Sequence, residues 1–304
     1  MKNCLNIKCR GNIELLYDYG SNYNFADINF DCTTTSYSKP KIYKCNICEL
    51  KFSELAVALT NKKIEDKYSN VVDNIYINEI PQREKYFSSL YKKISYNFSK
   101  DHSVLEVGSY YGVFGNIIKP NVKNYSGLEL SKHGSDYSKK NYNLEIFNET
   151  IEEHSERQIK YDIIIMSDVI EHFSNPFKML ETIEKILRPD GLLIFTTFNM
   201  DSLYAKISGK NYHWILPMHL FYFSNKTLKN ICLENNLKII KIKNDSRVVS
   251  FYYLLNKLEL IFPKFKFLFR YINKIKYLQK ISINVNLFDL NIYFVKKNKS
   301  INDA

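Results

Sequence analysis

The sequence predicts an α/β protein built on a mostly parallel sheet, and two observations lead to this expectation. Between residues 103 and 242, short apolar runs alternate with amphipathic stretches long enough to form helices. Strands separated by helices usually pair in parallel, because each crossover helix returns the chain to the same end of the sheet. The 304 residues are 45% hydrophobic and 25% charged, which is typical of a folded globular protein.

Three segments are expected along the chain. Residues 1–60 hold five of the six cysteines and show little periodic pattern. Residues 61–100 begin polar and then form a helix, because apolar residues recur every three or four positions from Arg83 to Phe98. Residues 101–304 are expected to form the large domain, with a helical insertion near 250–280.

Seven strands are expected in the large domain. The last is expected to be antiparallel and to lie at an edge of the sheet. The runs that predict them are SVLEVG, NYSGLEL, NLEIF, YDIIIMS, GLLIFTT, LKIIKI and VNLFDLNIYFVKKN.

A glycine-containing loop, VGSYYGVFG, follows the first strand. Gly108 and Gly112 bracket a turn that lets the backbone approach a ligand and that starts a helix. Tyr110 stands where such loops usually carry another glycine. Glu129 ends the second strand 21 residues after Gly108, where a carboxylate can accept both hydroxyl hydrogens of a ribose. The pattern fits either a nicotinamide or an adenosylmethionine cofactor.

Later landmarks separate these two cofactors. YDIIIMSDVIEHFSNP is a buried strand that breaks into a polar turn, and a helix, an RPDG turn and another strand follow it. This ordered set resembles the class I S-adenosylmethionine (SAM)-dependent methyltransferases. The resemblance implies a Rossmann-like, mostly parallel seven-stranded sheet with helices on both faces. It also implies a SAM cofactor and a family that tolerates Tyr110 in the loop.

The resemblance implies cofactor contacts residue by residue. Glu106 and Gly108 would line the amino-acid part of SAM, and Gly112 would allow the close turn into the next helix. Glu129 would hold the ribose, with Leu130 beside the adenine. The remaining positions are Glu149, Thr150 and Ile151 near the adenine amino edge, and Ser167 and Asp168 at the methionine end. The acids Glu149 and Glu152 fit an exposed helix start equally well, because the helix dipole favours acids there.

The segment after the fifth strand resembles bacterial methyltransferases that act on quinones and glycan intermediates. The matching residues are Asn199, Trp214, Pro217, His219, Leu220, Phe223 and Ser224. No (D/N)PP(Y/F) motif follows the fourth strand, which argues against methylation of amino groups in bases and glutamine. We therefore expect O-methylation of a sugar, a glycan intermediate or a secondary metabolite. The alternatives are a quinone-precursor or small-phenol O-methyltransferase, and a zinc-ribbon adaptor with a vestigial cofactor domain.

The DVIEH turn supplies the candidates for catalysis. His172 is the expected base, because the pKa of imidazole lies near neutral pH, and His219 is the second candidate. Glu171 stands beside His172. The similar pattern in quinone-pathway methyltransferases suggests an alternative, in which Asp168, Glu171 and His172 bind a divalent metal. A further alternative is that Glu171 and His172 only cap and orient the turn.

Four cysteines near the N-terminus form a candidate structural zinc site. Cys45 and Cys48 have the spacing of a zinc-ribbon hairpin, and Cys4 and Cys9 form a wider pair. A similar ribbon precedes the methyltransferase core in one bacterial subgroup. The alternative is a set of free buried cysteines or a decayed site.

The net charge of +11 is concentrated near the C-terminus. Residues 226–299 carry 16 Lys and Arg against 4 Asp and Glu. The basic, aromatic stretch at 250–280 would either cover the core or contact an acidic membrane surface. No base-reading motif is present, so a nucleic-acid partner is not expected. We expect a cytoplasmic protein that acts on a small molecule or a glycan intermediate. Its 250–280 stretch would allow peripheral contact with the inner face of the membrane. The sequence predicts no oligomeric state.

Overall fold

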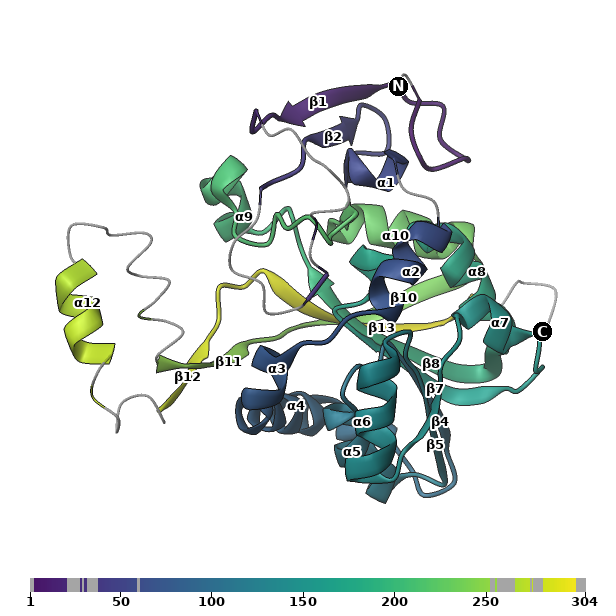
Figure 1. Cartoon of the computed structure of the whole chain (residues 1–304). Coiled ribbons are helices and arrows are strands. Elements are labelled where there is room, and N and C mark those ends of the chain that lie inside the picture. The colour runs from purple at the N-terminus through teal and green to yellow at the C-terminus, as the bar shows by residue number, and fades with distance from the viewer. Residues whose placement is uncertain are drawn as a thin grey trace.

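A computed structural model of the chain describes residues 3–20, 28, 30–31, 38–58, 61–251, 255, 266–273, 275 and 281–298. The architecture is a large sheet with helices on both faces and a small N-terminal sheet beside it (Figure 1).

The large sheet has seven strands in the order β10-β13-β8-β7-β4-β5-β6. The five strands from β8 to β6 pair in parallel, and β13 runs antiparallel to both of its neighbours. The predicted mostly parallel α/β sheet is therefore confirmed. The strands are β4 (Ser103–Val107), β5 (Asn124–Leu128), β6 (Glu145–Phe147), β7 (Tyr161–Ser167), β8 (Leu187–Phe198), β10 (Leu237–Asn244) and β13 (Leu290–Lys297).

The prediction that the last strand lies at the sheet edge was wrong. β13 pairs with β8 on one side and with β10 on the other, so β10 is the edge strand. Burial explains this arrangement. Residues 290–295 of β13 are buried without interruption, whereas Leu237 is the one buried residue of β10. A continuous apolar run is typical of a strand that is covered on both faces.

Helices cover both faces of the sheet. Val104 and Ile163 pack toward α4 and α5 in one apolar cluster, and Leu105 and Ile164 pack toward α8 and α10 in another. Alternate residues of a strand point to opposite faces, which produces the two clusters. The helices are α4 (Ile80–Ile94), α5 (Val113–Ile118), α6 (Lys132–Tyr142), α7 (Ile151–Ser155), α8 (Pro176–Ile186), α9 (Leu203–Ser208) and α10 (Asn225–Glu234).

The N-terminal segment forms its own sheet, β1-β2-β3-β9, which lies at the top of Figure 1. Three of its strands come from the first 53 residues, but β9 belongs to the segment that follows β8. Through β9 the small sheet is joined to the wall of the large domain. Its elements are β1 (Ile13–Tyr17), β2 (Ile42–Cys45), β3 (Lys51–Ser53), α1 (Leu55–Ala58) and β9 (Phe221–Tyr222).

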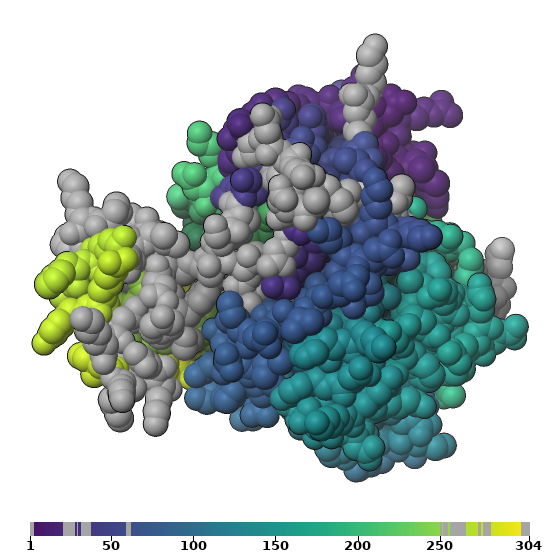
Figure 2. Space-filling view, viewed as in Figure 1, coloured from purple at the N-terminus to yellow at the C-terminus, as the bar shows by residue number. Residues whose placement is uncertain are grey.

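The segment 61–100 connects the two sheets. It contains α2 (Asn61–Ser69) and α3 (Asn74–Asn78) before α4, the helix that the apolar spacing predicts. In Figure 2 this segment, in blue, crosses the visible face between the purple N-terminal residues and the teal surface of the large domain.

The predicted helical insertion at 250–280 lies largely outside the described residues. Its described part contains α12 (Lys266–Asn273), and a two-stranded pair, β11 (Arg247–Ser250) with β12 (Ser282–Val285), flanks it. Among the helices of the described residues, none combines the length and the apolar character that crossing a bilayer requires.

Candidate active site

A cavity of about 900 Å³ opens at the carboxyl ends of β4, β5 and β7. The order of the sheet reverses at β4, because β5 and β6 lie on one side of it and β7 and β8 on the other. In open α/β sheets, ligands bind at this kind of switch point. The cavity is therefore the candidate active site.

The loop after β4 approaches the cavity with three residues in the left-handed region. Gly108, Tyr110 and Gly112 have φ angles of 72°, 47° and 75°. A Cβ atom on Gly108 would lie 2.7 Å from Val169, and one on Gly112 would lie 2.7 Å from the Oγ of Ser138. Both glycines are thus required by backbone conformation and by close packing. Gly108 lines the cavity, whereas Gly112 lies outside its lining and starts α5.

Tyr110 fits the loop because its side chain turns toward α3. The Tyr110 hydroxyl donates to Asp73 at 3.1 Å, and the ring packs edge-on against Tyr76 with 4.7 Å between the centroids. The backbone N–H of Tyr110 donates to Glu129 Oε2 at 2.6 Å. The tyrosine therefore keeps the backbone hydrogen bond of the loop and adds contacts to the helices above it.

Glu129 is a buried carboxylate held in a fixed position on the cavity wall. In addition to Tyr110, the N–H of Ser131 donates to Glu129 Oε1 at 2.6 Å. Burial raises the pKa of Glu129 from 4.5 to about 7, although the backbone donors oppose this shift. Leu130 also lines the cavity. This arrangement can accept hydrogen bonds from a ligand hydroxyl pair.

Glu106 lies deeper, at the end of β4. It accepts a hydrogen bond from the Tyr125 hydroxyl, and burial raises its pKa to about 8. Beside it, the hydroxyl of Ser109 is buried and has no hydrogen-bond partner among the described residues. Because such an unpaired buried group is costly, Ser109 has the capacity to bind a ligand polar atom. The sequence reading missed Ser109.

Glu149, Thr150 and Ile151 all line the cavity, but two of them also have structural partners. Thr150 caps α7 in a reciprocal arrangement with Glu153. Both carboxylate oxygens of Glu149 accept from Arg157 at 2.8 Å, and His154 lies 2.7 Å away. Glu149 thus lies at the cavity, before the cap of α7 and paired with Arg157, while Glu152 stands in the first turn of the helix.

Ser167 and Asp168 follow β7 and also line the cavity. Asp168 has a φ of 55° and accepts a hydrogen bond from the Thr196 hydroxyl at 2.7 Å. Its second oxygen forms an ion pair with Arg247 of β11. Asp168 is thus oriented from two strands.

Glu171 and His219, which are buried, and His172, which is half-buried, form a group whose possible ligand atoms lie within 4.8 Å of one another. The two imidazole rings meet edge to face, with 4.8 Å between their centroids. Both histidines line the main cavity, whereas Glu171 lies behind its wall. The metal-binding alternative needs a correction, because Asp168 faces Arg247 and the third member of the group is His219.

The protonation of this group follows from burial. Glu171 Oε2 accepts from the Thr197 hydroxyl at 3.0 Å, while Glu171 Oε1 is buried with no partner in the described part of the chain. Burial raises the pKa of Glu171 to about 8 and lowers the pKa of His172 to about 4. Burial also holds the pKa of His219 well below 6.5.

Two further site residues escaped the sequence reading. The Tyr68 hydroxyl lies 2.8 Å from His172 Nδ1, and Arg247 projects from β11 into the cavity lining. Tyr68 sits on a polar helix with no distinguishing pattern. Arg247 was seen only as one of many basic residues near the C-terminus, because nothing in the local sequence links it to Asp168.

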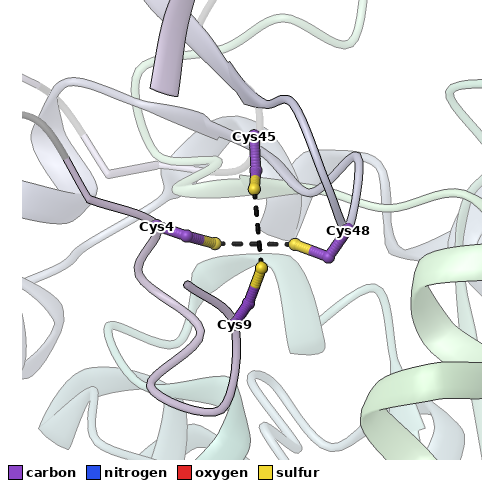
Figure 3. A group of neighbouring side chains, drawn as sticks. All are labelled: Cys4, Cys9, Cys45 and Cys48. Carbon is purple, nitrogen blue, oxygen red and sulfur yellow. Dashed lines mark hydrogen bonds between the residues drawn. The ribbon is translucent and has the colours of Figure 1, made fainter. Parts of the chain in front are cut away.

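The four N-terminal cysteines converge on one point (Figure 3). The sulfur atoms of Cys4 and Cys48 lie 3.5 Å apart, and those of Cys9 and Cys45 lie 3.7 Å apart. A tetrahedral zinc site with bonds of about 2.3 Å has sulfur–sulfur distances of about 3.8 Å. Backbone N–H groups also point at three of the sulfurs, each at 3.4 Å. The residues present therefore fit a zinc ion.

The fold is the one that SAM-dependent methyltransferases share. A SAM-dependent methyltransferase from Archaeoglobus fulgidus superposes with a TM-score of 0.51 and 18% identity, over 74% of this chain and all of that chain. A family model described as a methyltransferase domain matches residues 80–242, which is more than half of the chain. The chain therefore belongs to the methyltransferase-domain family of SAM-dependent enzymes, as the sequence predicted.

Two curated relatives match a shorter region. Both are ubiquinone biosynthesis O-methyltransferases. The protein from Actinobacillus pleuropneumoniae serotype 7 is 26% identical over 106 residues, which cover 32% of this chain and 45% of the relative. The protein from Erwinia tasmaniensis is 25% identical over 105 residues, which cover 33% and 43%. The chain thus spans less than half the length of the curated relatives it matches.

Proposed function

We propose that the protein is an O-methyltransferase that binds SAM in the switch-point cavity and methylates a hydroxyl group of a sugar, glycan or secondary-metabolite intermediate. The observation that carries the proposal is the buried Glu129 carboxylate, held by two backbone N–H groups on the wall of a 900 Å³ cavity. When bound, SAM supplies an electrophilic methyl group on a sulfonium sulfur.

The residues at the carboxyl ends of the strands fit this cofactor. Glu129 would accept the ribose hydroxyls, and Leu130 would contact the adenine. Glu106 and Gly108 would line the amino-acid part, where the unpaired Ser109 hydroxyl offers a further donor. The remaining positions, at the adenine edge and the methionine end, are Glu149, Thr150, Ile151, Ser167 and Asp168.

The acceptor would bind between the cofactor residues and the aromatic wall beyond β8. Phe198 and Trp214 stack with 4.0 Å between their centroids and line the cavity together with Tyr204. An apolar wall excludes water and packs against the faces of sugar or phenol rings. His172 would remove the proton of the acceptor hydroxyl, with His219 as the second candidate and Glu171 orienting the pair from behind.

A quinone-precursor or small-phenol O-methyltransferase is the second candidate function. The names of the two curated relatives favour it, and the aromatic wall suits a planar phenol. The acceptor assays should therefore include both sugar and phenol hydroxyls.

Zinc is proposed as a structural component of the N-terminal segment. Cys4, Cys9, Cys45 and Cys48 would hold it as thiolates in a closed site, and the ion would stabilise the end of the small sheet that carries β2.

Calorimetry with S-adenosylhomocysteine, the demethylated product of SAM, tests the proposed function. The wild-type protein is expected to bind, and Glu129→Ala is expected to bind about 10–100-fold more weakly, because a buried charge-assisted contact is lost. Glu181→Ala removes an exposed acid paired with Lys185 and serves as the matched control, with unchanged affinity. Absence of binding to the wild-type protein would contradict the enzyme proposal and favour an adaptor with a vestigial cofactor domain.

A further inference from the structure

Arg247 occupies an unusual position in the acceptor part of the cavity. It is the first residue of β11, which lies beyond the residues 80–242 that the family model matches. Its guanidinium lies over the rings of Tyr86, Phe198 and Trp214, at 4.8, 5.3 and 5.4 Å from their centroids. The three rings hold the side chain in one place.

The hydrogen-bonding capacity of Arg247 is largely unused. Among the described residues, its single side-chain hydrogen bond is the one that Nη2 donates to Asp168. The Nε–H group is buried and has no acceptor there. A guanidinium has five N–H donors, and a buried donor without an acceptor costs free energy. A ligand oxygen in the cavity would satisfy this group.

The other acids near Arg247 already have partners. Asp245 is paired with Lys93, and the Tyr212 hydroxyl donates to Asp289 at 2.7 Å. In the described lining of the cavity, the other Lys or Arg side chain is Arg83 of α4, which is paired with Glu79 and also has a buried Nε–H without an acceptor. Of the two, Arg247 is the one that lies over Phe198 and Trp214, so it is the guanidinium next to an acceptor in the aromatic part of the cavity.

The geometry favours an anionic oxygen group over a neutral hydroxyl. A guanidinium donates its hydrogen bonds in its own plane, so recognition of a ligand oxygen takes place at its edge. Carboxylate and phosphate oxygens match that edge, and charge-assisted hydrogen bonds are about twice as strong as neutral ones. We propose that Arg247 selects acceptors that carry a carboxylate or a phosphate close to the hydroxyl that is methylated. This inference rests on the proposed function and names its substrate class.

Trp214 is the single tryptophan of the chain, and it reports on this part of the cavity. Its fluorescence would be followed while the protein, saturated with S-adenosylhomocysteine, is titrated with matched probes at constant ionic strength. The probes are glucuronate against glucose, benzoate against benzyl alcohol, and glucose 1-phosphate. At least one charged probe is expected to bind about 10-fold or more tightly than its neutral counterpart. Comparison of glucuronate with glucose 1-phosphate separates carboxylate from phosphate recognition.

Arg247→Gln is expected to abolish the preference for charged probes. Arg188→Gln, which removes an arginine paired with Asp162 outside the cavity lining, is expected to keep it. Arg247→Lys keeps the charge beside Asp168 but not the planar edge, and it is expected to lose most of the preference even if the glutamine variant does not fold. Equal affinity for charged and neutral probes, no response to any charged probe, or a preference that survives both Arg247 substitutions would overturn the inference. Failure of the wild-type protein to bind S-adenosylhomocysteine would instead refute the proposed function.

Discussion

Two imidazoles reach the acceptor part of the cavity, and the proton of His219 can be placed from its hydrogen bond. His219 Nδ1 is 2.8 Å from the carbonyl oxygen of Trp214, which only accepts, so Nδ1 carries the proton and Nε2 has the free lone pair. His172 Nδ1 lies 3.1 Å from the carbonyl oxygen of Met218 and 2.8 Å from the Tyr68 hydroxyl, which can donate or accept. When Nδ1 donates to Met218, His172 Nε2 is free to accept a proton. Burial lowers the pKa of both rings, which makes each a weaker base than free imidazole.

His172→Ala is expected to lower kcat by about 100-fold or more, because the acceptor hydroxyl loses its base, and to leave the affinity for S-adenosylhomocysteine nearly unchanged. The measurement is turnover with an acceptor that supports it. His133→Ala, which removes an imidazole bonded to Tyr111 outside the cavity lining, is the control.

The other outcomes reassign the residues of this group. Activity that survives His172→Ala but collapses in His219→Ala gives the role of base to His219. Activity lost on chelation and restored by Mg²⁺ or Mn²⁺ alone supports a metal held by Glu171, His172 and His219.

At the scale of single residues, the sequence predicted the positions that a local sequence pattern identifies. It missed the positions that come together only in the folded chain. Gly108 and Glu129 could be found because the glycine-containing loop and the end of the second strand follow each other at a typical spacing along the sequence. Arg247 meets Asp168 only because the fold brings the start of β11 beside the residue that follows β7, a contact across 79 positions that no local pattern encodes. Glu171 was placed in the turn correctly, but its position behind the cavity wall depends on packing.

The pairing of β3 with β9 links the zinc segment to the active site. The N–H of Ser53 donates to the carbonyl oxygen of Leu220 at 2.9 Å, and the N–H of Leu220 donates to that of Glu171 at 2.8 Å. Backbone hydrogen bonds thus run from the N-terminal sheet through the residue after His219 to the turn that carries His172. The order of the N-terminal sheet should therefore influence the positions of His172 and His219.

Elemental analysis is expected to find about one zinc per chain, as one closed four-cysteine site requires. Cys45→Ser should remove the metal, because three thiolates leave the site open. Cys232→Ser changes a buried cysteine outside the group and should retain it. Protein that is prepared without a chelator, contains no zinc and has four reactive thiols would contradict the metal assignment.

At the scale of elements, all seven large-sheet strands and their order along the chain follow from apolar runs between helical patterns. The position of β13 within the sheet did not follow. The order of strands in a sheet depends on which strands and helices each apolar run packs against, and a single run does not encode this. The four-stranded N-terminal sheet could not be predicted either. Its strand β9 has only two residues and is a strand only because it pairs with β3.

For the whole molecule, buried carboxyl groups couple stability to pH. Burial raises the pKa of Glu106 from 4.5 to about 8, with Glu129 and Glu171 shifted in the same direction. As the pH rises above 4.5, the unfolded chain releases these protons while the folded chain retains them. Since the unfolded state then binds fewer protons, the free energy of unfolding falls until the folded groups ionise.

These carboxyl groups are therefore expected to lower the stability of the ligand-free protein between about pH 5 and about pH 8. His172 and His219 act in the opposite direction below about pH 6.5, because the unfolded chain then binds protons that the folded chain does not. Glu106→Gln cannot ionise, so its loss over this range should be smaller by on the order of 3 kcal/mol. Urea unfolding at several pH values measures the difference, and Glu181→Gln, at an exposed position, should follow the wild type. A parallel fall in Glu106→Gln and the wild type would show that Glu106 does not contribute.

The central position of β13 has a consequence for the order in which the chain can assemble. During synthesis, β4 to β8 can pair as they emerge, but β10 has no partner until residues 290–297 arrive and insert beside β8. Until then β8 presents an open edge, which invites pairing with other chains. The strand that completes the sheet also places β11 and β12 at the cavity, so a ribosome-bound chain that lacks it would have the cofactor half of the site but not the wall that carries Arg247.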